Sequence, residues 1–255
     1  MENAVLLADG LGANAYHLLL VFLRVGAAVS LFPGFGESSL PTRVKLAVAL
    51  VFALIVAPAT PGLGILTFPQ ILRIGGAEIV IGLTFGLAVR LLVLALQTAG
   101  SIAAQATSLS QILGGMAAEP MPAIGHVLVL SGITLAVVLG LHVRVAEYLI
   151  QSYALLPVGS LIAAQDMARW GTGQVARAFA LALSLAAPFV IASLVYNLAL
   201  GAINRAMPQL MVAFIGAPFI TFGGLFLLFA GAPLLLTLWH EALLQTLANP
   251  LGVLP

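Results

Sequence analysis

The sequence has no cysteine and very little charge, and each shortage excludes a class of protein. Without cysteine, the chain can form neither disulfides nor thiolate metal sites, and it has no cysteine nucleophile. Only 7% of its 255 residues are charged, eight acidic and nine basic, whereas an average soluble domain has roughly 25%. So few charges cannot cover the exterior of a soluble protein of this size. The chain is therefore predicted to be an integral membrane protein or the core of a largely buried assembly.

Basic residues and catalytic motifs are also scarce. The formal net charge is +1 and Lys45 is the only lysine, whereas nucleic-acid binding requires clustered Lys and Arg. No second histidine follows His240-Glu241 at the spacing of a zinc helix, and neither a Gly-x-Ser-x-Gly turn nor a Walker loop is present. The four histidines are widely spaced. We therefore expect no enzyme activity, no metal or other cofactor, and no nucleic acid as a partner.

Apolar residues dominate what remains. They make up 62% of the chain, and the mean hydropathy is +1.18. The pattern predicts an all-α membrane protein with five to seven apolar helices, several of them broken or hairpin-like. The expected runs are Tyr16–Phe32, Val44–Ala57, Ile71–Leu96, Val127–Tyr153, Val175–Gly201 and Leu210–His240.

Two of these runs have unusual lengths. Val44–Ala57 is expected to be too short to span a bilayer without its neighbours. Leu210–His240 contains several Pro and Gly residues, so it is expected to be bent or to form two helices.

The orientation of the chain in the membrane stays open. Arg43 and Lys45 after the first run favour an external N-terminus. The later connector containing Arg169 favours the opposite orientation.

A polar interruption separates the last two apolar runs. Within Pro188–Pro218, the first run ends at Gly201 and the polar stretch Asn204–Gln209 follows. Arg205 is the only charged residue between Arg177 and Glu241. A break in a bilayer needs hydrogen-bond partners from elsewhere, so this stretch suggests a hairpin turn or a broken helix buried against protein. The alternative is a plain hydrophilic connector, and the residues leave both interpretations open.

Charged residues inside the apolar runs are candidates for function or packing. Glu78, Gly82, Gly86 and Arg90 recur every four residues, so they lie along one slowly rotating helix face. Gly82-x-x-x-Gly86 would let another backbone approach closely. Glu78 and Arg90 lie about 18 Å apart along a helix, so each needs a different partner. We interpret Glu78 as a functional or subunit-packing residue, and Arg90 and Arg144 as snorkelling residues or members of structural ion pairs.

The sequence resembles the FliR family of flagellar export-gate subunits, whose close relatives are the SctT proteins of type III secretion. The resemblance covers most of the chain and rests on the order and spacing of several motifs. They are Arg24, Pro33, Pro41-Thr-Arg43-x-Lys45-Leu-Ala, Glu78-x-x-x-Gly82-x-x-x-Gly86, Gly140-Leu-His142, Ser152-Tyr153 with Pro157-x-Gly159, and Asn204-Arg205-x-x-Pro208-Gln209 with Gly216-x-Pro218. Ala106, Met211 and Ala213 depart from the residues usual in the family.

This resemblance implies one export-gate domain over residues 1–255 and a non-enzymatic role. The protein would lie in the cell inner membrane, at the flagellar basal body, and its helices would pack in a spiral with FliP and FliQ. FlhB would wrap that complex, and unfolded flagellar proteins would pass through its channel. The candidate assembly and packing residues are Glu78, Gly82, Gly86, Arg90, Arg205, Pro208 and Gln209.

The resemblance also gives a role to the neutral stretch Gln97–Pro122, because a loop in this part of the family projects into the pore and helps to close it. Within it, residues 107–122 contain one acid, no base, two glycines, two prolines and two methionines. Flexible methionines could form an adaptable seal. The candidate plug residues are Ile112, Leu113, Met116 and Met121. The alternative is a mobile loop in solvent.

Two other functions remain as alternatives. The chain could be the SctT subunit of an injectisome, which the residues do not separate from a flagellar protein. More distantly, it could be a small-molecule or ion transporter whose midplane site contains Glu78, Arg90 and the break at Pro208. A transporter of that kind predicts an inverted repeat, and none is visible in the sequence.

Overall fold

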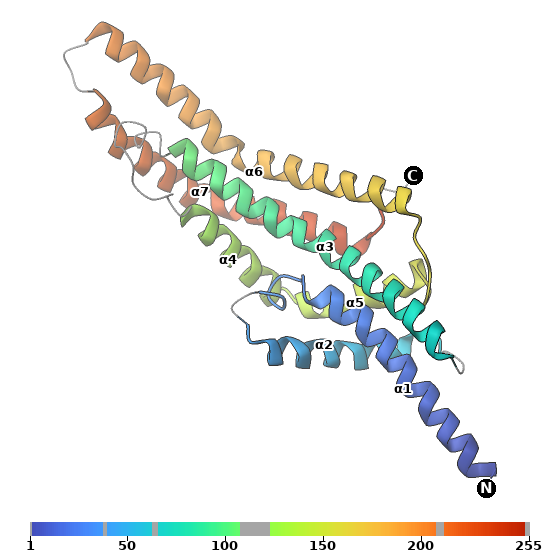
Figure 1. The fold of residues 1–255 in the computed structure, drawn as a ribbon. Coiled ribbons are helices and arrows are strands. Elements are labelled where there is room, and N and C mark those ends of the chain that lie inside the picture. Colours follow the sequence, from blue (N-terminus) through green and yellow to red (C-terminus); the bar gives the residue numbers. More distant parts are fainter. Residues whose placement is uncertain (1, 38–39, 63–65, 108–122, 208–211, 253–255) are drawn as a thin grey trace. The chain divides into compact units, whose positions relative to one another are not determined.

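The protein is built of α-helices, as its computed structural model shows (Figure 1). The structure describes residues 2–37, 40–62, 66–107, 123–207 and 212–252, and within these ranges there is no β-strand. The elements are α1 (Glu2–Val29), α2 (Thr42–Val56), the 3-10 turn η1 (Ala57–Ala59), α3 (Phe68–Thr107), α4 (Ala123–Val138), α5 (Leu141–Leu155), α6 (Ala164–Ala206) and α7 (Val212–Ala248). The predicted all-α class is confirmed, with seven α-helices in the described part of the chain.

Several of these helices are long and apolar enough to cross a membrane. In the residues that the structure describes, four candidate spans occur, and α4 with α5 would make a fifth if the pair is one broken span. The four are Thr42–Ala59, Phe68–Thr107, Ala164–Ala206 and Pro218–Ala248. The chain is therefore a multi-pass membrane protein. The run Val44–Ala57, expected to be too short to span without its neighbours, is extended at both ends, to Thr42 in α2 and to Ala59 in η1, and the extended segment of 18 residues is a candidate span.

Helix α3 is longer than the sequence pattern indicated. The apolar run was expected to end at Leu96, but the helix continues to Thr107. The added segment is rich in small and hydroxylated residues, and their hydroxyls bond back to the helix itself. Ser101 Oγ donates to the carbonyl of Gln97 at 3.0 Å, and Thr107 Oγ1 donates to that of Ala103 at 3.0 Å. The first part of the expected pore loop, residues 97–107, is therefore helical.

Proline and glycine interrupt the chain at different places from those expected. The apolar run Val127–Tyr153 is divided into α4 and α5 at Gly140, which has the left-handed φ of 87° that favours glycine. In contrast, α6 continues through Pro188, and α7 contains both Pro218 and Pro233 as one helix. The two-helix alternative for the last run is therefore wrong. Membrane helices tolerate proline where neighbouring groups satisfy the freed carbonyls.

The described contacts divide the chain into two compact units. Unit 1 comprises Met1–Leu91, Ala136–Gln174 and Leu243–Pro255. Within it, α1 packs along α2, and α2 also contacts α5 (Figure 1). Tyr148 is buried in its core, between the ring edges of Phe32 and Phe85, and its hydroxyl donates to the carbonyl of Phe85 at 3.0 Å. This core fixes α5 against α3 and against the segment that follows α1, and so helps to position the site described below.

Unit 2 comprises Leu92–Leu135 and Val175–Ala242. The backbones of α3 and α4 approach closely at Gly100 and Gly125, where a Cβ on Gly100 would overlap the Cα of Gly125. Trp239 of α7 is buried, and its indole nitrogen donates to the carbonyl of Leu92 at 2.8 Å. Small residues thus bring these membrane helices into backbone contact. The single domain expected over residues 1–255 stays a prediction.

Candidate functional site

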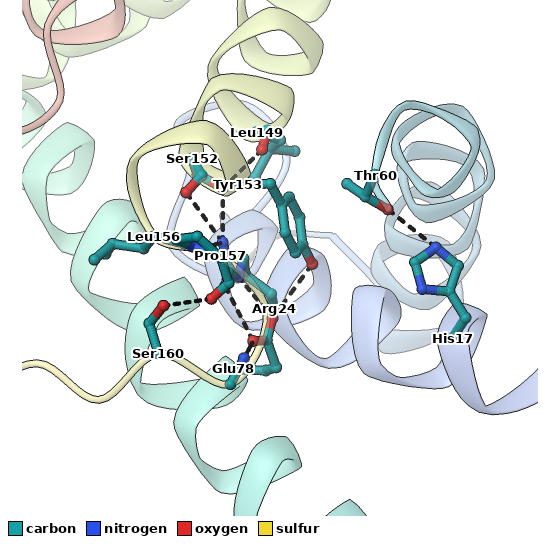
Figure 2. Close-up of polar contacts among 11 residues, drawn as sticks. His17, Arg24, Thr60, Glu78, Leu149, Ser152, Tyr153, Leu156, Pro157 and Ser160 are labelled. Atoms are coloured by element: carbon teal, nitrogen blue, oxygen red, sulfur yellow. Dashed lines mark hydrogen bonds and ion pairs between the residues drawn. The ribbon is translucent and has the colours of Figure 1, made fainter. Parts of the chain in front are cut away.

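A buried ion pair joins α1 to α3 inside unit 1 (Figure 2). Arg24 Nε donates to Glu78 Oε2 at 2.7 Å, and Arg24 Nη2 donates to Glu78 Oε1 at 3.0 Å. The two side chains are 1% and 0% exposed. This two-bond arrangement uses the planar fork of the guanidinium, which matches the geometry of a carboxylate.

The other terminal nitrogen of Arg24 binds the C-terminal end of α5. Nη1 donates to the carbonyl of Ser152 at 3.1 Å and to that of Leu156 at 2.8 Å. The last carbonyls of a helix have no partner within the helix, and a cation there is also favoured by the helix dipole. Arg24 therefore neutralises Glu78 and caps α5 at the same time.

The carboxylate of Glu78 is saturated with hydrogen bonds. Besides the two bonds from Arg24, it accepts one from the backbone N–H of Gly159 at 2.9 Å and one from the hydroxyl of Tyr153 at 3.3 Å. A carboxylate offers about four acceptor positions, and all four are used here. The Tyr153 ring also lies under the guanidinium, with its centroid 3.8 Å from the Arg24 Cζ, which is a cation–π contact.

A turn after α5 delivers the backbone N–H that Glu78 accepts. The backbone N–H and the hydroxyl of Ser160 both donate to the Pro157 carbonyl, at 3.1 and 2.6 Å. Gly159 lies inside this turn with a φ of 76°. A Cβ at this position would also lie 3.3 Å from Ile74 Cγ1. Glycine is therefore needed here both for the backbone conformation and for the space.

Two further glycines of α3 bring it close to α1 beside the ion pair. A Cβ on Gly82 would overlap the carbonyl oxygen of Arg24, and one on Gly86 would lie 2.8 Å from that of Ala28. The four-residue spacing thus puts Glu78 and both glycines on the face of α3 that meets α1. The backbone that approaches the glycine pair is a segment of the same chain.

The remaining candidate residues do not join this site. Arg90 pairs with Glu37 at 2.8 Å, with side chains 30% and 28% exposed, and Arg144 pairs with Glu147 on the surface of α5 at 3.2 Å. Arg205 is exposed in the last turn of α6. The candidates that lie outside the described residues are Ile112, Leu113, Met116, Met121, Pro208 and Gln209.

The chemistry of the site is that of a structural junction. Four segments meet there, namely α1, α3, the end of α5 and the turn at 157–160, and the carboxylate has no acceptor position left for a ligand. In the part of the chain described, no group of three or more His, Asp or Glu residues is placed to hold a metal ion. The arrangement therefore fixes the relative positions of these segments.

Sequence reasoning identified Glu78 but not its partner. Arg24 lies 54 positions earlier, and the sequence pattern indicates it only as a member of the family's N-terminal motif and not as the partner of Glu78. Ser152, Tyr153 and Gly159 belong to motifs of the family, which do not indicate that they surround an ion pair. A usable signal was present, because isolated charges of opposite sign inside two apolar runs are expected to pair in a medium of low dielectric constant.

Comparison with known proteins gives consistent matches along most of the chain. The family model for bacterial export proteins, family 1, matches residues 15–246. The flagellar biosynthetic protein FliR of Caulobacter vibrioides is 36% identical over 221 residues, covering 84% of this chain and 88% of that protein. FliR of Escherichia coli K12 is 30% identical over 218 residues, covering 84% and 83%. FliR of Aquifex aeolicus is 29% identical over 223 residues, covering 86% of each.

Replacing Glu78 with alanine is expected to destabilise unit 1 strongly, because Arg24 would stay buried without its counter-charge. Removing one partner of such a pair costs about 3–5 kcal/mol. The matched control is Glu37→Ala, which breaks the partly exposed pair with Arg90 and should cost about 0–1 kcal/mol. Thermal unfolding of the protein, purified in detergent together with the subunits that co-purify with it, measures both changes. Equal losses for the two variants would contradict the central role of the buried pair.

Gly159→Ala is expected to destabilise the protein by more than about 1 kcal/mol, because alanine is strained at this positive φ. The added methyl group would also press on Ile74, so the N–H that binds Glu78 would shift. Gly62→Ala is the control, because no atom lies within 4 Å of a Cβ added there and its φ is not in the left-handed region. Unfolding midpoints of the two variants are compared. A Gly159→Ala variant as stable as the control would refute the need for glycine in this turn.

Proposed function

This chain belongs to the FliR family, the bacterial export proteins of family 1, and we propose that it is a membrane component of the flagellar protein-export apparatus. It forms with FliP and FliQ the channel through which unfolded flagellar subunits leave the cell, and FlhB adjoins this complex. Its place is the inner membrane at the basal body, and its role is not enzymatic. The observation that carries the proposal is the 36% identity to a flagellar biosynthetic protein over most of both chains.

The apolar exterior of the long helices supports a function inside a membrane assembly. Helix α6 exposes large apolar side chains along much of its length, including Phe179, Leu183, Leu194 and Leu198, each at least 60% exposed. Exposed apolar surface on this scale marks contact with protein or lipid. In the proposed complex, neighbouring subunits and the membrane share that surface.

The alternatives are less well supported. An injectisome subunit of the SctT type would share the fold, but the relatives with the matches described above are flagellar proteins. A transporter site needs polar groups free to bind a substrate. Glu78 is saturated by bonds within unit 1, and Arg90 is paired with Glu37.

The candidate assembly residues fall into two groups in this proposal. Glu78, Gly82 and Gly86 act indirectly, because they hold α1, α3 and α5 in the arrangement that a partner subunit meets. Arg90, Arg205, Pro208 and Gln209 contribute to contacts between subunits. In motile cells, loss of the buried pair would then reduce the yield of the complex as well as the stability of the chain.

Expressed alone, the chain is expected to aggregate or to be degraded, because its apolar surface would lack its protein partners. Co-expression with FliP and FliQ should give a stable complex that survives purification in mild detergent. The measurement is the yield and size distribution on gel filtration with and without the partners. A long-lived, monodisperse monomer obtained from the chain alone would count heavily against the export-gate proposal.

We also propose that residues 108–122, which lie outside the described residues, close the channel at rest. A pore wide enough for an unfolded polypeptide would leak ions unless something fills it. The closing segment cannot be strongly charged, because an unpaired charge in a dry constriction is costly, and residues 108–122 contain one acid, Glu119, and no base. Ile112, Leu113, Met116 and Met121 supply apolar side chains for that purpose.

Deleting residues 110–118 is expected to leave assembly with FliP and FliQ largely intact and to make the membrane permeable to ions or small solutes. Dye uptake and growth of cells that express the variant with its partners measure the leak. The control is the same variant expressed without FliP and FliQ, which should not leak. If the deletion instead strongly reduces assembly and the fraction that still assembles stays tight, the segment is a packing element.

A further inference from the structure

We propose that the groove between α1 and α2 binds an anionic phospholipid, with one acyl chain along its apolar floor and the phosphate beside Lys45. This site lies within unit 1 and is separate from the buried ion pair. The inference goes beyond the export function, and it depends only on the protein being embedded in a membrane.

The floor of the groove is apolar, and several of its side chains are small. The groove has a volume of about 360 Å³, which falls within the roughly 300–1,000 Å³ of sites for small ligands. Gly26 helps to keep the groove open because it has no side chain. A Cβ added there would lie at ordinary van der Waals distances, 3.8 Å from Phe22 and 3.9 Å from Ala49. The apolar lining comes from Phe22, Leu23, Gly26, Ala27, Leu46, Ala49 and Ile79.

One end of the groove is polar. Ser30, Thr42 and Lys45 complete its lining, and all three lie next to the connection between α1 and α2. The Lys45 ammonium donates to the carbonyl of Gly36 in that connection at 3.0 Å. Because the two helices are joined there and pack along each other, the polar residues gather at one end, and the apolar floor extends away from them.

The charge at this end has no counter-ion within the described residues. Lys45 takes part in none of the ion pairs found there, and the bond to Gly36 uses one of its three donors. Glu37, the acid nearest to it in the described sequence, is bound to Arg90. Arg43, two residues before Lys45, is exposed and adds a second positive charge. The end of the groove therefore attracts an anion.

A phospholipid combines the two properties that the groove presents. Its acyl chain matches the apolar floor, and its phosphate matches the ammonium of Lys45 and the hydroxyl of Thr42. The Ser30 hydroxyl already donates to the carbonyl of Ala27 at 2.7 Å, so it only makes this end of the groove polar. An ordinary lipid of the surrounding shell would contact any exposed apolar residue of α2 and would not distinguish headgroups. A preference for net negative charge at this one place is the property that separates a binding site from general solvation by lipid.

The test uses tryptophan fluorescence of the protein, with whatever subunits co-purify, in nanodiscs. Leu46→Trp reports on the groove, and Val51→Trp is the matched reference, because both residues are on α2 with 60% and 56% exposure but Val51 does not line the groove. Each variant is compared in brominated phosphatidylglycerol and brominated phosphatidylcholine at equal mole fraction. The quencher is thus the same and only the headgroup charge differs.

The expected result is a preference for phosphatidylglycerol of about fivefold at Leu46→Trp, which corresponds to the roughly 1 kcal/mol of one lysine at an anionic membrane. No preference is expected at Val51→Trp. Adding Lys45→Gln to Leu46→Trp should abolish the preference, and adding Arg43→Gln should retain most of it. Gly26→Leu, which fills the floor, should reduce quenching by both lipids.

Two outcomes would overturn the proposal. Equal quenching by the two lipids at Leu46→Trp would mean unselective contact with lipid, and quenching by neither would mean that protein covers the groove. If the tryptophan variants do not fold, the lipids that co-purify with the unmodified protein and with Lys45→Gln are compared by mass spectrometry. The proposal predicts less phosphatidylglycerol with Lys45→Gln, and equal amounts would overturn it. Yield of the complex with FliP and FliQ tests the export proposal separately.

Discussion

The buried pair between Arg24 and Glu78 is the interaction on which the rest of unit 1 depends. Removing two charges from water costs several kcal/mol for each ion, and attraction between them offsets this only when the remaining donors and acceptors are satisfied. In this protein that condition fixes the end of α5 and the turn at Gly159, because both supply groups that the pair needs. One electrostatic requirement therefore determines where four segments of the chain meet.

The pair could not form without the close approach of α1 to α3. Helices in a bilayer gain little from burying apolar side chains against each other, so close contact at small residues decides how they pack. Gly82 lets the Arg24 backbone reach the surface of α3 one turn beyond Glu78. Packing and charge pairing reinforce each other here, because the glycines set the distance that the bidentate ion pair requires.

The sequence predicted the helices well because each membrane helix must satisfy its own backbone, and long apolar runs therefore indicate helices. It failed at the end of α3, where small and hydroxylated residues suggested a loop although Ser101 and Thr107 bond back to their own helix. It also failed to pair Arg24 with Glu78. No local rule connects residues 54 positions apart, and the choice among several isolated charges depends on helix packing that the pattern does not contain.

Arg24 and Lys45 show two different uses of a basic residue in a chain that has few of them. Arginine presents a planar fork of five donors, which suits a buried carboxylate and helix carbonyls at once, whereas lysine is a compact charge on a flexible stem. Arg24 is enclosed among acceptors of its own chain, so it acts on the fold. Lys45 is partly exposed at the end of an apolar groove, and its one hydrogen bond within the described residues leaves two of its donors for a ligand. The difference in burial and in bonding, and not the shared positive charge, separates a structural residue from one that can bind a ligand.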